Sequence, residues 1–230
     1  MTSFFLRPCE NSSLKIVSTG IYYALALCAA GALVGWLVGP WFAAPMVLLA
    51  LFCLYFFRDP DREIPSGPVA VSPADGRVVA VKPEGGLNRL SIFLNVFDVH
   101  VNRAPIAGRI TYSKHHPGTY LDARDPYCHQ KNEALTWAFA GERATLVVRQ
   151  ITGAIARRIV PWSKLGATVE KGHRFGMIRF GSRTDVYLPL DAEILVKVGD
   201  RVEGCSSVVA RLAAPDAGIV PTASFPPLLS

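Results

Sequence analysis

Apolar residues are concentrated in the first quarter of the chain. From residue 16 to residue 57 there is no Asp, Glu, Lys or Arg, and this interval is about twice the roughly 20 apolar residues that cross a bilayer as one helix. Gly39-Pro40 interrupts it near the middle, where a proline after a glycine ends one helix and fits the start of another. The pattern predicts a transmembrane helical hairpin, with helices at about residues 16–38 and 41–57.

The flanks of this hairpin predict its orientation. Arg7 and Lys15 precede the apolar interval, and Arg58 and Arg62 follow it. Positive charge is retained on the cytoplasmic side of membranes, so we expect both ends of the hairpin to be cytoplasmic. A signal peptide would have one shorter apolar core and a cleavage site, whereas a second apolar segment follows directly here. The hairpin is therefore expected to stay as an anchor, residues 1–57, in the cell membrane.

The remainder of the chain, residues 58–230, has a different pattern. Short runs rich in β-branched residues alternate with turn signals such as Pro-Ala-Asp-Gly and Glu-Gly-Gly, and stretches with helical periodicity are hard to find. The runs are Val69–Val71, Arg77–Val81, Leu90–Val96, Val99–Val101, Arg109–Tyr112, Ala144–Ile151, Met177–Phe180, Asp185–Tyr187, Glu193–Val198 and Ser207–Leu212. We predict a mostly β domain of about 170 residues on the cytoplasmic side.

A local repeat refines this fold class. Gly166–Gly172 and Gly199–Gly204 are two glycine-bounded turns, each followed by an apolar strand. Their glycines are expected to supply positive φ angles. Such turns are typical of barrel-sandwich folds that resemble lipoyl and biotinyl carrier domains, so the domain is predicted to be barrel-sandwich-like.

Charge and cysteine content indicate which classes of partner and of site the chain can have. The net charge is +6, of which about +5 belongs to the part from Arg58 onward. A basic domain tethered to a bilayer is attracted to anionic headgroups, although an ordinary solvated surface explains the charge equally well. No basic run or recognition-helix pattern indicates nucleic acid. The five cysteines form no C-x-x-C pair, so we expect reduced thiols and neither a disulfide framework nor a metal site.

The segment around Gly181-Ser182 suggests a specific chemistry. Gly181 leaves its own carbonyl sterically open, and Ser182 places a hydroxyl beside it. If a tight turn holds the two together, the peptide bond can shift from nitrogen to oxygen, and β-elimination of the ester followed by hydrolysis leaves a pyruvoyl group and ammonia. A Gly-Ser pair alone is more often a plain turn. A serine hydrolase fits less well, because the G-x-S-x-G elbow and a following helix are absent from the sequence.

Further motifs accompany this pair in a fixed order. They are Arg58–Pro65, Ser72–Val78, Phe93–Gly108, Lys131–Glu133, Met177–Asp185 and Val198–Val202. In this order and spacing, residues 58–212 resemble the short, membrane-anchored form of phosphatidylserine decarboxylase.

This resemblance implies an activity and a cofactor. The family cleaves itself at the Gly-Ser bond, so residues 1–181 and 182–230 would form a heterodimer of two chains, with Ser182 converted to an amino-terminal pyruvoyl. The pyruvoyl would form a Schiff base with phosphatidylserine in the bilayer and accept electrons as CO₂ leaves, which yields phosphatidylethanolamine. Pyruvate made from the chain itself would be the cofactor, without a metal. Pyruvoyl enzymes often associate, so a homo-oligomer stays open.

The resemblance also suggests catalytic residues besides Gly181 and Ser182. Asp75 in Pro-Ala-Asp-Gly corresponds to an aspartate of the family's self-cleavage apparatus, although Asp-Gly is also common turn chemistry. Longer family members contain Tyr-His-Arg-Val-His before a proline, and their first histidine aligns with His100. Their second histidine aligns with Arg103, so activation by Asp75 with His100, or by Asp75 with a water, stays open.

Three residues are candidates for binding the substrate headgroup. Arg183 follows the expected pyruvoyl position, Glu133 ends the Lys-Asn-Glu motif, and His115 precedes a Pro-Gly loop. A strand-surface charge for Arg183 and plain solvent exposure for His115 are the alternatives. A non-catalytic membrane-tethered carrier domain is the alternative function, with Lys171 as the nearest candidate for the modified lysine.

Overall fold

A computed structural model describes residues 15–154, 158–179 and 181–213. The chain forms two compact units, of which the first ends at Asp61 and the second begins at Arg62.

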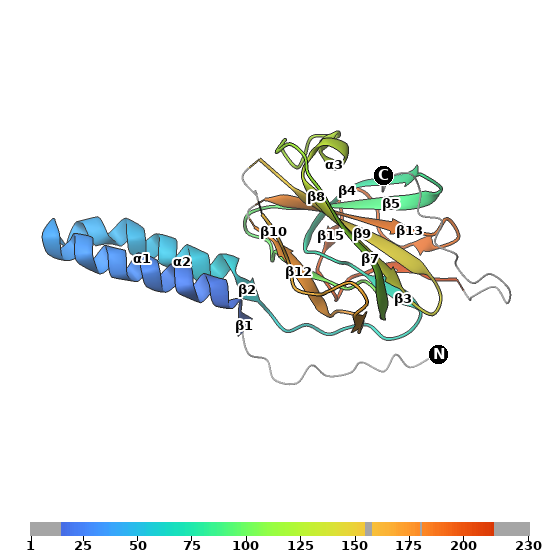
Figure 1. The fold of residues 1–230 in the computed structure, drawn as a ribbon, viewed down its shortest axis with the longest axis horizontal. Coiled ribbons are helices and arrows are strands. Elements are labelled where there is room, and N and C mark those ends of the chain that lie inside the picture. Colours follow the sequence, from blue (N-terminus) through green and yellow to red (C-terminus); the bar gives the residue numbers. More distant parts are fainter. Residues whose placement is uncertain (1–14, 155–157, 180, 214–230) are drawn as a thin grey trace. The chain divides into compact units, whose positions relative to one another are not determined.

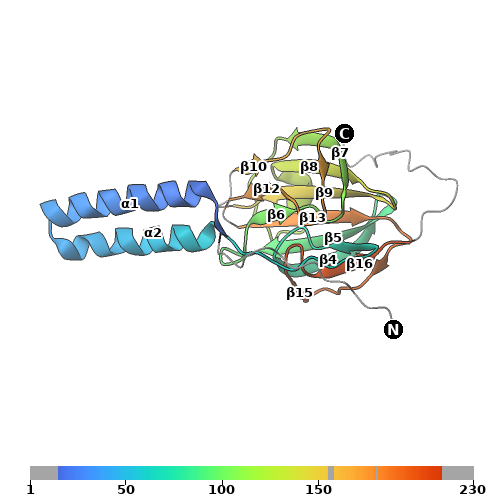
Figure 2. The same ribbon diagram turned by 90° about the horizontal axis from the view of Figure 1, so that it is seen from below.

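The N-terminal unit is a helical hairpin. Helix α1 (Ser18–Leu37) is followed by the 3₁₀ turn η1 (Pro40–Ala43) and helix α2 (Ala44–Phe56), and the two helices run side by side (Figures 1 and 2). Strands β1 (Lys15–Ile16) and β2 (Arg58–Asp59) pair at its open end. The predicted hairpin is thus present, and α1 is long and apolar enough to cross a membrane, whereas η1 and α2 together form a shorter apolar segment.

The C-terminal unit is built around a curled antiparallel sheet of eight strands in the order β11-β7-β8-β9-β13-β5-β4-β15 (Figures 1 and 2). In chain order the strands are β4 (Gly76–Glu84), β5 (Leu87–Leu94), β7 (Gly108–His116), β8 (Ala134–Ala140), β9 (Thr145–Thr152), β11 (Thr168–Val169), β13 (Ser182–Leu188) and β15 (Arg201–Val202). Strand β13 lies between β5 and β9 and is buried along its whole length.

Two three-stranded sheets complete the unit. One has the order β10 (Ile159–Pro161), β12 (Arg174–Ile178) and β6 (Val101–Arg103), and the other has the order β14 (Glu193–Ile194), β16 (Val208–Arg211) and β3 (Val69–Val71). The short helix α3 (Cys128–Lys131) lies in the connection between β7 and β8.

Side chains alternate between the two faces of the central sheet, as the pleat requires. Val186 and Leu188 of β13 point into the main core with Ile92 and Leu94 of β5. The intervening residues of β13 are also buried, but they include charged side chains. The sheet is thus covered on both faces, which explains why its central strands contain few exposed positions.

The prediction of a mostly β domain is confirmed, with corrections in detail. Strand β8 was not expected, because its sequence Ala-Leu-Thr-Trp-Ala-Phe-Ala has no β-branched run. The strand expected from Asp185 begins earlier, at Ser182, and the end of the strand expected at Phe180 lies outside the described residues.

The predicted glycine turns are confirmed at three of their four glycines. Gly166, Gly172 and Gly199 have positive φ. In the second turn the positive φ near the closing glycine belongs to Cys205 instead, so Gly204 has a different role.

Candidate active site

The Gly181-Ser182 peptide lies at the start of the central strand. Ser182 is the first residue of β13 and pairs with Leu94 at the end of β5 and with Thr152 at the end of β9. Gly181 has φ of 65°, a conformation that L side chains rarely adopt. This turn places Gly181 and Ser182 where the start of β13 meets the ends of β5 and β9.

The Ser182 hydroxyl is buried and unpaired. Its oxygen has no hydrogen-bond partner among the described residues, and the residue is 0% exposed. A buried polar atom without a partner is unfavourable, and a chemical role is one of the reasons for which such an atom is retained. An orphaned hydroxyl beside an unhindered glycine carbonyl fits a serine that is converted to a pyruvoyl group.

His100, the residue directly before β6, contacts the backbone of Gly181. The Gly181 N–H donates to Nε2 of the imidazole at 3.2 Å, and Nδ1 lies 2.9 Å from the Asp98 carbonyl oxygen. Because a carbonyl only accepts and an N–H only donates, these two bonds require a neutral ring with its proton on Nδ1. The structure therefore brings His100, Gly181 and Ser182 together, as the sequence suggested.

Gly153 was missed by the sequence analysis. A Cβ at this position would lie 2.4 Å from the Gly181 carbonyl oxygen and 3.3 Å from its carbon. The missing side chain thus leaves the space that this carbonyl occupies. A glycine directly after a predicted strand was the available signal, but it does not say which distant carbonyl approaches it.

A cavity of about 200 Å³ opens beside Gly181. Its walls include Gly153, Asn95 and Val96 after β5, and Ala123 and Arg124 from the connection between β7 and β8. Gly181 thus lines a cavity, whereas Ser182 is fully buried behind it.

Arg124 is the cationic residue of this cavity. It is exposed, and its guanidinium donates to Asp122 with its Nη2 at 2.7 Å. The Arg124 hydrogen bonds lower the pKa of Asp122 to about 2, so the pair is ionised at neutral pH. Neither residue was singled out from the sequence.

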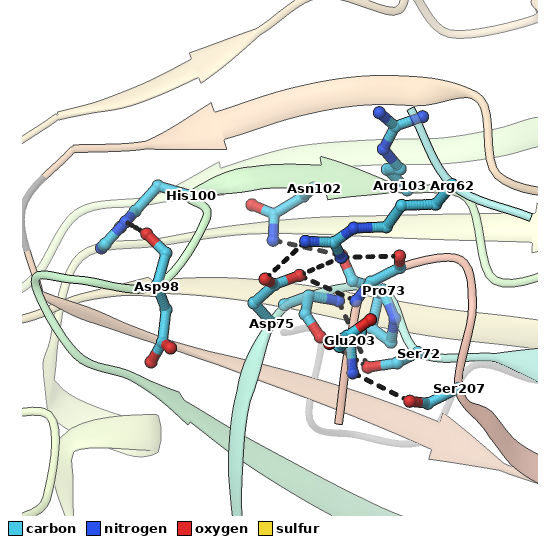
Figure 3. Close-up of polar contacts among 12 residues, drawn as sticks. Arg62, Ser72, Pro73, Asp75, Asp98, His100, Asn102, Arg103, Glu203 and Ser207 are labelled. Carbon is cyan, nitrogen blue, oxygen red and sulfur yellow. Dashed lines mark hydrogen bonds and ion pairs between the residues drawn. The ribbon is translucent and has the colours of Figure 1, made fainter. Parts of the chain in front are cut away.

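Asp75 is held away from His100. Its carboxylate is paired with both terminal nitrogens of Arg62 and accepts a hydrogen bond from the Gly204 N–H at 2.8 Å. Figure 3 shows this pair, with the His100 ring on the other side of the view beside Asp98. Gly204 also accepts from Arg62 through its carbonyl, so the second glycine turn binds the carboxylate and its partner.

The ion pair of Arg62 with Asp75 gives a stability prediction. Both side chains are mostly buried. Asp75→Asn leaves the Arg62 charge without its partner and is expected to destabilise the domain by about 3–5 kcal/mol, as is Arg62→Gln. The double variant should lose much less than the sum, because neither charge is then left alone. Thermal unfolding of the four proteins measures this.

The same variants separate two roles of Asp75. If Asp75 acts only through the ion pair, both single variants should slow the expected cleavage of the Gly181–Ser182 bond to a similar extent. Cleavage blocked in Asp75→Asn and normal in Arg62→Gln would instead indicate that the carboxylate takes part in the reaction.

A buried chain of polar side chains fixes β6 against β13. Asn102 donates to Thr184 Oγ1 and to the Pro73 carbonyl, each at 3.3 Å, and accepts from Gln150 at 2.7 Å. Trp137 in turn donates to Gln150 at 2.8 Å. Because Asn102 lies two residues after His100 and Thr184 two after Ser182, this chain sets the spacing between the imidazole and the serine.

Arg183 does not share a face with Ser182. Successive strand residues point to opposite faces, and Arg183 donates to Asp185 at 2.7 Å and to Ser91 at 2.6 Å on the far face. It is 4% exposed. The structure thus places Arg183 in a buried ion-pair network and not at the serine.

Glu133 and His115 lie close to each other. Glu133 accepts from His115 at 2.9 Å and from the Tyr120 hydroxyl at 2.6 Å. Burial acts to raise the pKa of Glu133, but these two hydrogen bonds outweigh it and lower the pKa. The Glu133 carbonyl accepts a hydrogen bond from the N–H of Thr152, the residue that pairs with Ser182. The Glu133 side chain instead contacts His115 and Tyr120.

The structure also bears on the alternative functions. Lys171 donates to the Gly67 carbonyl at 3.1 Å, and burial lowers the pKa of its amine, unlike a lysine displayed for modification. A strand follows Ser182, whereas a nucleophile elbow leads into a helix. Neither a carrier nor a serine hydrolase is favoured.

Comparison with known proteins identifies the family of the chain. The phosphatidylserine decarboxylase family model matches residues 49–210. Three curated relatives are each called phosphatidylserine decarboxylase proenzyme. The protein of Solibacter usitatus is 62% identical over 198 residues, which cover 86% of this chain and 97% of the relative. The protein of Symbiobacterium thermophilum is 44% identical, and the match covers 82% of this chain and 90% of the relative. The protein of Streptomyces coelicolor is 48% identical, and the match covers 69% of this chain and 72% of the relative. The chain belongs to the phosphatidylserine decarboxylase family.

Proposed function

We propose that this chain is the proenzyme of a phosphatidylserine decarboxylase, which cleaves its own Gly181–Ser182 bond and uses the pyruvoyl group formed from Ser182. The observation that supports it best is the buried, unpaired Ser182 hydroxyl beside the Gly181 carbonyl, with His100 bonded to the same residue. The relatives' shared name, proenzyme, supports a cleavage step.

In the proposed cleavage, Ser182 Oγ attacks the Gly181 carbonyl carbon, and the bond from that carbon to the Ser182 nitrogen breaks. The resulting ester loses the Ser182 α-proton, and Gly181 leaves as a carboxylate. The dehydroalanine left at position 182 takes up water and releases ammonia. The positive φ of Gly181 and the absence of a side chain at Gly153, which leaves room for the Gly181 carbonyl, are proposed to let this carbonyl change geometry without a steric clash.

His100 is the proposed proton carrier. Its Nε2 has no proton in the bonded tautomer, so it can accept one from the Ser182 hydroxyl once the Gly181 N–H turns away. Asp98 holds the other ring nitrogen through its carbonyl. Asn102 is proposed as a positioning residue for His100, because it lies in the strand that follows His100 and is bonded to Thr184 of β13. Asp75 is proposed as a positioning residue for the second glycine turn, which it binds together with Arg62.

A pyruvoyl group at position 182 supplies a ketone that condenses with the substrate amine and accepts the electron pair released with CO₂. The protein fixes the position of residue 182 and provides its surroundings. The strand ends at Leu94 and Thr152 fix residue 182 at the cavity, and the burial of Ser182 excludes water. Arg124 lines the cavity together with its partner Asp122, and its guanidinium is the proposed contact for the phosphate or carboxylate of the headgroup, in exchange for Asp122.

The proposed product is phosphatidylethanolamine, made at the cytoplasmic membrane. The apolar hairpin is proposed as the anchor, with the β domain on the cytoplasmic side, as the basic residues Lys15 and Arg58 suggest. The working enzyme would be a heterodimer of its two cleavage chains.

The intact mass of the purified protein tests the proposal. We expect two chains of about 20 and 5 kDa, in proportion to the residues before and after the bond in a chain of 25.0 kDa. The smaller should have a ketone in place of its amino terminus and react with hydroxylamine. Ser182→Ala is the control and should remain one chain. A single unmodified wild-type chain would disprove the proposal.

A further inference from the structure

The chain segment after β5 forms a closed turn, here called the Phe97 turn, from Asn95 to Asp98. The Asp98 N–H donates to the Asn95 carbonyl at 3.0 Å, which makes this a β-turn. The Asn95 N–H donates to the Asp98 carboxylate at 2.9 Å, and the Phe97 N–H donates to the Asn95 side chain at 2.8 Å. Val96 and Phe97 thus occupy the two middle positions.

These middle positions have an unusual composition. Turns favour Gly, Pro, Asn, Asp and Ser there, yet this one has two large apolar residues, and Phe97 is 61% exposed. The exposure does not result from a loose loop. Asp98 is buried, and its carboxylate accepts a hydrogen bond from Arg201 at 2.6 Å. The phenyl ring is therefore presented to solvent by a fixed support.

The turn also lies at the candidate active site. Asn95 and Val96 line the cavity beside Gly181, and the Asp98 carbonyl is bonded to His100. The exposed Arg124 lines the same cavity. The exposed Phe97 ring thus adjoins the rim of a cavity at which Arg124 is paired with Asp122, and an exposed apolar ring at such a rim suits a lipid surface, where rings enter the boundary between headgroups and acyl chains.

We propose that the Phe97 turn docks into the bilayer, with the Phe97 ring in the boundary between headgroups and acyl chains. This inference rests on the proposed function, because a lipid whose chains stay in the bilayer must reach the cavity through its headgroup. Docking of the cavity rim lets phosphatidylserine present its serine to residue 182 without leaving the membrane.

Leu190 provides a matched control. It is as exposed as Phe97, at 61%, but it follows the opposite end of β13. The strand places about 20 Å between Ser182 and that end. Substitutions at both positions therefore change similar exposed apolar surface, one near the cavity and one far from it.

Tryptophan fluorescence of the full chain tests the docking. Phe97→Trp and Leu190→Trp are reconstituted in nanodiscs of phosphatidylcholine and phosphatidylglycerol, with or without bromine on the acyl chains. Each variant adds one tryptophan to the same four. We expect the added fluorescence of Phe97→Trp to be quenched at least about twofold more than that of Leu190→Trp, since bromine quenches only rings at its depth. Equal quenching would overturn the proposal.

Activity gives a second readout. The quantity compared is the ratio of turnover on phosphatidylserine in nanodiscs to turnover on a soluble short-chain phosphatidylserine. This ratio should be about tenfold lower for Phe97→Ser than for Leu190→Ser. The reason is that Phe97→Ser removes part of the free energy gained when the phenyl ring leaves water for the bilayer. Equal ratios would contradict the docking. If the wild-type chain is neither cleaved nor active on the soluble lipid, the proposed function fails, while the quenching result still decides whether the turn enters the bilayer.

Discussion

His100→Ala is expected to slow self-cleavage by about 10²–10⁴-fold, the range that a positioned general base contributes. The imidazole Nε2 is bonded to the Gly181 N–H, and the Ser182 hydroxyl has no partner among the described residues that could take its proton. Removing the ring removes the proposed proton acceptor. The rate at which the two fragments appear after a pulse of cell-free synthesis measures the effect.

Two further variants separate proton transfer from positioning. His100→Gln offers an amide oxygen to the Gly181 N–H but cannot carry a proton at neutral pH. If His100 is the base, the glutamine variant cleaves as slowly as the alanine variant, and if the ring only holds Gly181, glutamine restores much of the rate. His173→Ala removes an exposed histidine and should cleave normally. Normal cleavage of His100→Ala would remove His100 from the mechanism.

The sequence predicted the parts of the site that are contiguous or belong to recognisable motifs. Gly181, Ser182 and His100 belong to two motifs that the resemblance places together, and the structure shows His100 bonded to the Gly181 N–H. The partner of Asp75 was harder to predict. Arg62 lies in one of the quoted motifs, but its pairing with Asp75 depends on how the segment after the hairpin folds back onto the Gly204 turn. No local pattern contains this information.

Arg183 shows what an incorrect strand boundary can hide. With the strand expected from Asp185, Ser182 and Arg183 were both loop residues, and both could face a headgroup. Once β13 begins at Ser182, the alternation of the pleat puts the two side chains on opposite faces. The buried Asp185 then pairs with Arg183. The correct strand start alone would have predicted that Arg183 is structural.

Glycine contacts were the least predictable feature. Gly153 and Gly181 are distant in the sequence and lie in different strand connections, and their approach depends on the pairing of Thr152 with Ser182. A missing side chain has no chemical signature in one sequence. Its importance becomes visible only when the space that it leaves is found to contain the Gly181 carbonyl, the group attacked in the proposed cleavage.

Filling the space at Gly153 is expected to have the second large effect on cleavage, although no reacting group is changed. Gly153→Ala is expected to slow self-cleavage by about 100-fold or more, because a Cβ 2.4 Å from the Gly181 oxygen forces that carbonyl out of the position that the structure shows. A displacement of about 1 Å at a reacting centre can cost two orders of magnitude. The fragment-appearance assay measures the rate, and thermal unfolding shows whether the variant is folded.

The control for Gly153→Ala is Gly86→Ala. Gly86 has a positive φ, so alanine there is strained, but its Cβ would meet nothing within 4 Å. Gly86→Ala should therefore lose stability and still cleave at the normal rate, whereas Gly153→Ala should cleave slowly even where it is fully folded. If Gly153→Ala cleaves like the wild type, the carbonyl is not held in the position that the structure shows. The geometric origin of the cleavage would then be wrong, while Ser182 and His100 could still be its chemical groups.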